Sequence, residues 1–157
     1  MAVTPAGYIS TALESVAETL ANCAAFRTLM GAASASAARD LTYFQDCREL
    51  PVSPFAVVTV LPGSLVSVAN RTYQHECTVS VYILWTEITD AGDTKNDRTL
   101  RQTNPFGDLL AQVAALINTG TTYPAAGAPG YVPPARLPDS EPYEGCWDAT
   151  ITFTWTI

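Results

Sequence analysis

The stretch WDATITFTWTI, Trp147 to Ile157, alternates apolar and polar residues along its whole length. Strict alternation is typical of a β-strand with one buried face and one polar face. Asp148 and then four threonines fill the polar positions, with Thr150, Thr152 and Thr154 at the centre. The apolar positions hold Trp147, Ala149, Ile151, Phe153, Trp155 and Ile157. The segment therefore predicts a half-buried sheet strand whose second face carries hydroxyl groups.

Other segments predict the strands with which this one pairs. Residues about 55–61, 65–71 and 73–85 are rich in β-branched and aromatic residues, and Pro62-Gly63 closes the first of them. A shorter strand is suggested within 41–47. In 73–85, apolar and polar residues alternate, which is typical of an antiparallel strand with one solvated face.

Two helices are predicted, over about 8–30 and about 105–118. In each, apolar residues recur every three or four positions, which defines one helical face. Pro105 stands at the expected first position of the second helix. The expected fold is α+β, a mostly antiparallel sheet of four to five strands with two helices packed on one face, plus long loops. The length of 157 residues favours a single domain, 1–157.

The two longest predicted loops are candidates for contact with other proteins. Residues 86–101 have mixed charge, which is typical either of a solvated loop or of an interaction loop that pairs with a neighbouring subunit. Its candidate residues are Glu87, Asp90, Asp93, Lys95, Asp97, Arg98 and Arg101. Residues 119–144 are dense in proline and glycine, and Tyr123, Tyr131 and Arg136 are candidates for partner contact there.

Composition indicates which classes of binding partner and which cellular compartment are expected. The net charge of −7 disfavours tight nucleic-acid binding, although nucleic acid could still pass such a protein without adhering. The start MAVTPAGYIS lacks the basic region of a secretory signal, and no stretch has the roughly 20 apolar residues of a membrane span. We therefore expect a protein of a reducing cytoplasm, with no membrane association.

The sequence predicts no catalytic, cofactor-binding or metal site. His75 adjoins Glu76 on a strand, where neighbouring side chains point to opposite faces. Cys23, Cys47, Cys77 and Cys146 form no C-x-x-C pair. Cys23 and Cys77 lie on apolar faces, whereas Cys146 lies on the threonine side of its strand, where an accessible thiol is expected. The acidic residues of 86–101 lack the spacing of a calcium loop.

The order of elements resembles a family of phage proteins. An amphipathic first helix is followed by a proline-introduced strand SPFAVV (53–58), a hairpin, a charged loop, a helix NPFGDLLAQVAALI (104–117) and a closing strand ATITFTWTI (149–157). This layout, over about residues 8–118 and 145–157, is similar to that of tailed-bacteriophage tail-terminator or tail-completion proteins of the lambda minor tail protein U type.

The resemblance implies a structural virion protein with an α+β fold and no catalytic residues. Such proteins form a hexameric ring at the head-proximal end of the tail tube, stop tube growth and join the tail to the head. The implied partners are further copies of the chain, the tail-tube protein and a head-closure or connector protein. DNA would pass through without specific binding, in a virion neck assembled in the host cytoplasm.

Alternatives to this hypothesis remain open. The chain could be another neck, connector or tail-tube protein, or a small enzyme or ligand-binding domain built around His75, Glu76 or Cys146. The face bearing Thr150, Thr152 and Thr154 could be a solvated surface of good β-formers. It could also be a polar face turned toward a ring lumen or a neighbouring subunit.

Overall fold

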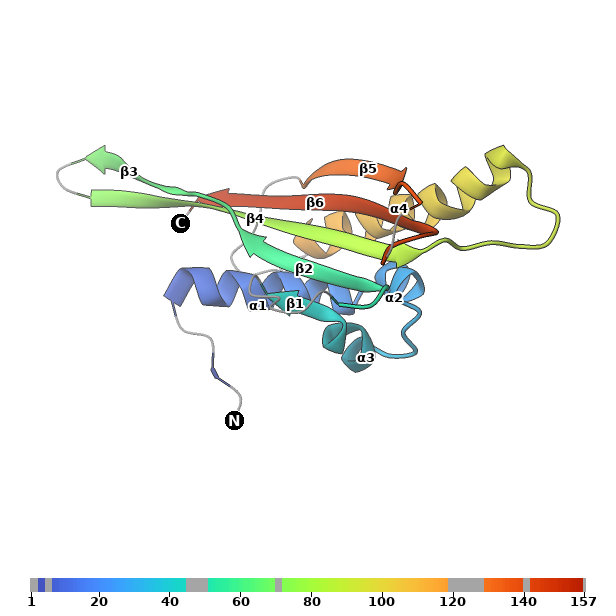
Figure 1. Cartoon of the computed structure of the whole chain (residues 1–157). Helices are drawn as coiled ribbons and strands as arrows, with labels where there is room; N and C mark the ends of the chain where they lie inside the picture. Colours follow the sequence, from blue (N-terminus) through green and yellow to red (C-terminus); the bar gives the residue numbers. More distant parts are fainter. Residues whose placement is uncertain are drawn as a thin grey trace.

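The fold is built on one open, twisted sheet, seen in a computed structural model that describes residues 3–4, 7–44, 51–69, 72–118, 129–139 and 142–156 (Figure 1). Its strands are β1 (Thr42–Phe44), β2 (Phe55–Val60), β3 (Ser64–Ala69), β4 (Thr72–Thr86), β5 (Gly130–Arg136) and β6 (Cys146–Thr156). They follow the order β1-β2-β4-β6-β5, and β3 pairs with β4 off this path. Among these described strands, only the β1–β2 pair is parallel. The predicted α+β class with a mostly antiparallel sheet is confirmed.

Strands β4 and β6 form the centre of the sheet. They pair antiparallel over eleven residue pairs, from Glu76↔Thr156 to Thr86↔Cys146. The apolar residues of the quoted stretch therefore lie directly opposite the apolar residues of β4, as in the pair Val81↔Ile151. Trp85, Ile151 and Phe153 are fully buried. The predicted core face of both strands is confirmed.

Four helices are described: α1 (Gly7–Ala21), α2 (Ala24–Met30), α3 (Ala35–Asp40) and α4 (Lys95–Asn118). One continuous apolar core joins α1, α2 and α4 to the inner faces of β2, β4 and β6. On the apolar faces of these helices, Val16, Leu20, Leu109 and Val113 are fully buried, and Leu13 and Leu116 pack at the margin of the core. The helices thus lie together on one side of the sheet (Figure 1).

The single helix predicted over about 8–30 is wrong, because the chain breaks between α1 and α2. Cys23 is extended there, with φ −82° and ψ 122°. The backbone amide of Ala25 is in the first turn of α2, where the helix itself supplies no acceptor. It donates a hydrogen bond to Oε1 of Gln112 on α4, at 3.0 Å. A side chain 87 positions away therefore satisfies the new helix end, which apolar periodicity could not reveal.

The predicted start of the second helix at about residue 105 is also wrong. Helix α4 begins ten residues earlier, at Lys95, and Pro105 lies inside it. Thr94 and Asp97 cap it reciprocally: the Thr94 amide donates to Oδ2 of Asp97 at 2.9 Å, and the Asp97 amide donates to Oγ1 of Thr94 at 3.2 Å. This cap satisfies two free amides, so the helix starts well before the proline.

The long loop predicted over 119–144 contains an edge strand. Strand β5 pairs antiparallel with β6, from Gly130↔Thr152 to Arg136↔Trp147, with a register shift after Val132. Pro133 and Pro134 argue against a strand when the sequence is taken alone. An edge strand nevertheless tolerates proline, because one side of it needs no ladder hydrogen bonds. Gly130 is required for the close approach, since a Cβ at this position would lie 2.7 Å from Oγ1 of Thr152.

Helix α3 lies in a segment for which the sequence predicts neither a helix nor a strand. Ser34 caps it, its Oγ accepting a hydrogen bond from the Ala37 amide at 3.1 Å. Strand β1 lies within the predicted short strand 41–47, and β2, β3, β4 and β6 lie within one or two residues of the predicted bounds. The pairing of β3 with β4 has a register shift between Ser67 and Ala69.

Strands β3 and β4 extend beyond the rest of the sheet as a two-stranded ribbon. Residues 72–75 of β4 pair with β3, whereas pairing with β6 begins only at Glu76. At the opposite end of the molecule, the first turns of α4 project past the sheet (Figure 1). The molecule therefore has a projection at each end of its long axis.

Candidate functional site

The side of the sheet that faces away from the helices carries a cluster of side chains with hydroxyl groups. Thr150, Thr152 and Thr154 lie in line on β6, and their partners across β4 are Tyr82, Ser80 and Thr78. We call the surface formed by Thr78, Ser80, Thr150, Thr152 and Thr154 the hydroxyl face. Oγ1 of Thr78 and Oγ1 of Thr154 share a hydrogen bond of 3.2 Å. The structure thus brings together the three threonines predicted to share a face.

Charge is confined to the ends of the hydroxyl face. Among the described side chains on this side of β4 and β6, the acidic ones are Glu76 at one end and Asp148 near the other, and none is basic. The Tyr82 hydroxyl donates to Oδ2 of Asp148 at 2.7 Å. Burial and this hydrogen bond raise the pKa of Tyr82 above its usual range. Tyr82 therefore stays neutral, and the strip between the two carboxylates is uncharged.

A small second core covers one end of this side of the sheet, and it corrects the expectation for Cys146. Phe55, Leu84 and Cys146 are buried there beneath Leu137 and Tyr143. The exposed fraction of Cys146 is only 3%. Its thiol is not accessible, because residues that follow β5 fold over it.

The groups considered for catalysis do not converge. Glu76 and Cys146 lie opposite Thr156 and Thr86, at the two ends of the β4–β6 pair. About ten residues of strand separate these positions, roughly 33 Å. Cys23 and Cys77 are buried as predicted, and burial raises the pKa of the Cys23 thiol to about 11. Cys47 and the side chain of His75 lie outside the described part of the structure.

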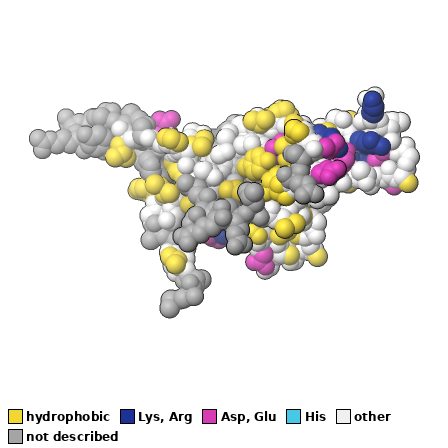
Figure 2. All heavy atoms as spheres, in the orientation of Figure 1, with side chains coloured by type: hydrophobic (Ala, Val, Ile, Leu, Met, Phe, Trp, Pro, Cys, Tyr) yellow, Lys and Arg dark blue, Asp and Glu magenta, His cyan; other side chains and the backbone are white. Residues whose placement is uncertain are grey.

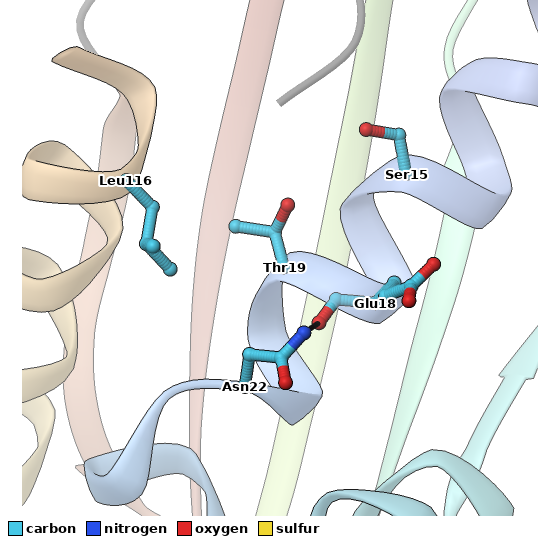
Figure 3. Close-up of a pocket in the computed structure, with 5 residues that line it drawn as sticks. All are labelled: Ser15, Glu18, Thr19, Asn22 and Leu116. Carbon is cyan, nitrogen blue, oxygen red and sulfur yellow. Dashed lines mark hydrogen bonds between the residues drawn. The ribbon is translucent and has the colours of Figure 1, made fainter. Parts of the chain in front are cut away.

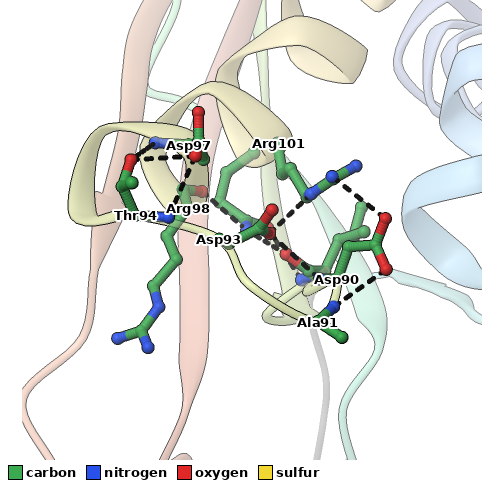
Figure 4. A network of polar contacts seen from close by, with 9 residues as sticks. Asp90, Ala91, Asp93, Thr94, Asp97, Arg98 and Arg101 are labelled. Carbon is green, nitrogen blue, oxygen red and sulfur yellow. Dashed lines mark hydrogen bonds and ion pairs between the residues drawn. The ribbon is translucent and has the colours of Figure 1, made fainter.

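The predicted interaction loop is shorter than expected and is tied together internally (Figure 4). Arg101 Nε donates to Oδ2 of Asp93 at 2.6 Å, and its NH2 group contacts Oδ2 of Asp90 at 3.2 Å. The Arg101 hydrogen bond lowers the pKa of Asp93, and the Thr94 amide lowers that of Asp97. These four charged groups therefore fold the loop and cap α4.

Gln102 on α4 joins this helix to the segment that follows β4, and the sequence patterns did not predict that it is buried. It is fully buried, and its Oε1 accepts hydrogen bonds from Trp85 Nε1 at 3.1 Å and from the Ile88 amide at 3.0 Å. Its Nε2 donates to the carbonyls of Ile88 at 2.7 Å and Arg98 at 3.0 Å. The one available signal was a glutamine four residues before Phe106, on the apolar stripe of the helix.

Lys95 and Arg98 remain as the outward-facing charges of this region. Within the described part of the chain, neither side chain makes an ion pair, and both residues are exposed on the first turns of α4. Figure 2 shows dark blue side chains gathered at the end of the molecule where α4 begins. Glu87 follows β4, and its amide donates to the Gly145 carbonyl at 2.9 Å.

The candidates from the second predicted loop lie on or near β5. Tyr131 is 58% exposed, and its ring packs edge-on against buried Phe106 with centroids 6.2 Å apart. Arg136 pairs with Asp139 at 2.9 Å. Tyr123 lies outside the described residues. Tyr131 and Arg136 thus occupy the exposed sheet edge, although each also makes an intramolecular contact.

A shallow pocket of about 260 Å³ lies between α1 and α4 (Figure 3). It is lined by Ser15, Glu18, Thr19, Asn22 and Leu116. Asn22 Nδ2 donates to the Glu18 carbonyl at 3.0 Å and so closes the end of α1. The described lining thus offers hydroxyl groups, an amide and one carboxylate beside the apolar side chain of Leu116.

No group of three or more potential metal ligands occurs among the described residues. None of the helices in the described ranges combines the length and apolarity needed to cross a bilayer. The sequence matches no model of a known protein family, and a search of curated proteins finds no significant relative.

Proposed function

We propose that this chain is a structural virion protein, the tail terminator of a tailed bacteriophage. In this proposal its copies form a ring, most simply of six, that caps the head-proximal end of the tail tube. The ring stops tube growth and joins the tail to the head. The proposal extends the resemblance in the order of elements, and the observation that carries it is the hydroxyl face.

The hydroxyl face has the chemistry that a channel for DNA requires. Helices cover the other side of the sheet, so this side is the one available to line a lumen. Its central strip holds hydroxyl groups and no described charge, so it offers phosphates no cation to bind. The net charge of −7 acts in the same direction over longer range. DNA would slide past such a surface without adhering.

The remaining surfaces supply contacts for the proposed partners. The α4 end and the β5 edge both project exposed side chains away from the core. In the proposed assembly, these regions meet neighbouring copies, the tail-tube protein and a head-closure or connector protein. The ring assembles in the host cytoplasm and remains in the virion neck.

Native mass spectrometry and electron microscopy of the purified chain test the ring directly. We expect a closed ring, and we expect the chain to shorten tubes when it is added to polymerising tail-tube protein. A chain that is strictly monomeric, both alone and with tubes, would refute the proposal. A chain that itself polymerises into long tubes would instead be a tube subunit.

The orientation of the sheet has its own test. Thr154→Cys on the hydroxyl face and Ser36→Cys on α3 each place a thiol at an exposed position, one on each side of the sheet. In the ring, a maleimide attached to a polymer wider than the lumen should label the Ser36→Cys variant but not the Thr154→Cys variant. A small maleimide should label both. Equal labelling of the two variants by the large reagent would place the hydroxyl face outside the lumen.

A further inference from the structure

The β3–β4 ribbon presents two strand edges that no described strand covers. The Leu61 amide donates to the Thr78 carbonyl at 2.9 Å, so the backbone groups of Thr78 point toward the side of β4 on which β2 and β3 lie. Backbone groups alternate in direction along an antiparallel strand. Tyr73 therefore points its N–H and C=O to the other side of β4, past the point where pairing with β6 begins. On β3, the same alternation points the backbone groups of Leu65 and Ser67 away from β4.

The two outer edges of the main sheet are protected against the addition of a strand. The Ala56 amide donates to the Leu41 carbonyl at 3.0 Å, so the next carbonyl of β1, that of Thr42, points outward. Arg39 NH1 donates to this carbonyl at 2.9 Å. Strand β5 contains two successive prolines, which lack amide hydrogens, and a register shift. Short edge strands, prolines and bulges are the features by which proteins prevent edge-to-edge pairing.

The ribbon has less protection of this kind. Strand β3 (Ser64–Ala69) and residues 72–76 of β4 contain no proline, lysine or arginine. The register shift between Ser67 and Ala69 lies toward the far end of the ribbon and leaves residues 64–67 regularly paired. A two-stranded ribbon is only marginally stable by itself in water. The projecting ribbon (Figure 1) is therefore a template for a strand from another molecule.

We propose that the ribbons of neighbouring copies pair edge to edge, the outer edge of β3 in one copy with residues 72–75 of β4 in the next. This inference rests on the proposed ring and assigns its subunit contact. The two edges belong to different strands, so the contact is head to tail and repeats from copy to copy until the ring closes. The added pairing is antiparallel, because rotation about the ring axis keeps every β3 in one direction and every β4 in the other. Closure then leaves no ribbon edge free.

This contact continues the wall of the proposed lumen. Strand β4 runs without interruption from the hydroxyl face into the ribbon, and its pairing with β6 places Glu76 on the same side of the sheet as Thr78. Ribbons set edge to edge extend that side of the sheet beyond the bodies of the subunits. The helices, which cover the opposite side, remain outside the wall.

Proline substitutions test the main-chain pairing. Leu65→Pro and Ser67→Pro each remove an amide that points outward, whereas the hydrogen bonds from β3 to β4 are made by the residues between them. Leu65→Ala and Ser67→Ala are the matched controls, because they change the side chain and keep the amide. We expect each proline variant to self-associate about two- to tenfold more weakly than its alanine control, since that is the typical net effect of one hydrogen bond. The urea transition of the core should be the same within each pair at a concentration where both are dissociated.

Amide hydrogen exchange, read residue by residue, identifies the edges that meet. The wild type is compared at a concentration where it is assembled and after dilution to the dissociated chain. We expect the amides of Leu65, Ser67 and Tyr73 to exchange at least about tenfold more slowly in the assembly, because pairing removes them from water. The amide of Tyr131 is the internal control: it points outward on β5, and its exchange should not change.

The outcomes separate the contact from the ring. A ring that is as stable in both proline variants as in the alanine controls, with no slowing at Leu65 and Ser67, would overturn the contact and leave the ring standing. Slowing at Tyr131 in place of Leu65 would assign the contact to β5, which also overturns our assignment.

Two other results would overturn the contact in different ways. Dimers in which Leu65 and Ser67 are slowed but Tyr73 is not would mean that β3 pairs with β3 of a second copy. Slowing of the ribbon amides only after addition of tail-tube protein would assign the ribbon to that partner. A strictly monomeric wild type, alone and with tail tubes, would contradict the ring and the contact together.

Discussion

Replacement of Gln102 by methionine should destabilise the fold more than any other single change of a polar side chain that we describe. Methionine keeps the volume of the buried side chain but removes both hydrogen-bonding groups. The Trp85 indole N–H and the Ile88 amide then lose their acceptor. Each unsatisfied buried donor costs about 1–3 kcal/mol, so the expected loss of unfolding free energy is about 2–6 kcal/mol.

Gln112→Met on the same helix is the matched control. Gln112 accepts one hydrogen bond, from the Ala25 amide, so the same substitution should cost about 1–3 kcal/mol. Urea denaturation followed by tryptophan fluorescence gives both values. The protein concentration must be held constant, because self-association adds to apparent stability.

The comparison between the two variants decides the outcome. A Gln102→Met variant within about 0.5 kcal/mol of the wild type, the usual range for surface substitutions, would refute the reasoning. So would a Gln112→Met variant that is the less stable of the two. Either result would mean that the junction of β4, its following loop and α4 does not depend on the Gln102 amide.

Two further predictions concern acid and the last strand. The Arg101 hydrogen bond lowers the pKa of Asp93 in the folded state, so its stabilising effect is present above the unfolded carboxyl pKa of about 3.9 and is lost as the pH falls through the folded value. Asp93→Asn should therefore lower the Tm at pH 7 and flatten the fall of Tm between about pH 5 and pH 2, the range over which paired carboxylates protonate; an unchanged slope would contradict this. Truncation after Thr150 removes buried Ile151 and Phe153, which contribute about 1.5–3 kcal/mol each, and should leave a chain without cooperative thermal unfolding. A sharp transition in the truncated chain would show that β6 is not needed beyond that point.

Local patterns predict the parts of the fold in which side-chain periodicity and burial agree. The alternation along β6 places Ile151 and Phe153 in the core and the threonines on the other side, because strand geometry leaves only those two faces. The same logic correctly places Cys77 on the inner face of β4. The hydroxyl face could therefore be predicted as a row of threonines, although not that Thr78 and Ser80 would complete it.

The errors arise where distant contacts or edge positions decide the local structure. Gln112 stabilises the break between α1 and α2 from a position far along the chain. No local sequence pattern predicts this break. Pro105 is a misleading start signal, whereas Thr94 with Asp97 three residues later marks the true start of α4. Pro133 and Pro134 favour a loop when the sequence is taken alone, because their place at a sheet edge depends on the pairing of β5 with β6.

The candidate site is predictable only in part for a similar physical reason. Charge alone suggests an interaction loop. In the structure, however, Arg101 folds back onto Asp90 and Asp93, so these three charges are paired within the molecule. Which cations remain outward depends on the helix start, since that start places Lys95 and Arg98 on the projecting turns.

The pairing of β4 with β6 has a mechanical consequence. A force applied along these strands, in opposite directions on the two, is carried by all eleven residue pairs in parallel. The load must break many hydrogen bonds together before the strands slide. A force that peels one strand sideways from its end breaks the pairs in sequence and needs far less tension. A subunit held at the ribbon and at the first turns of α4 is held beyond the two ends of β4, so the tension runs along the backbone of that one strand and does not shear the β4–β6 pairs.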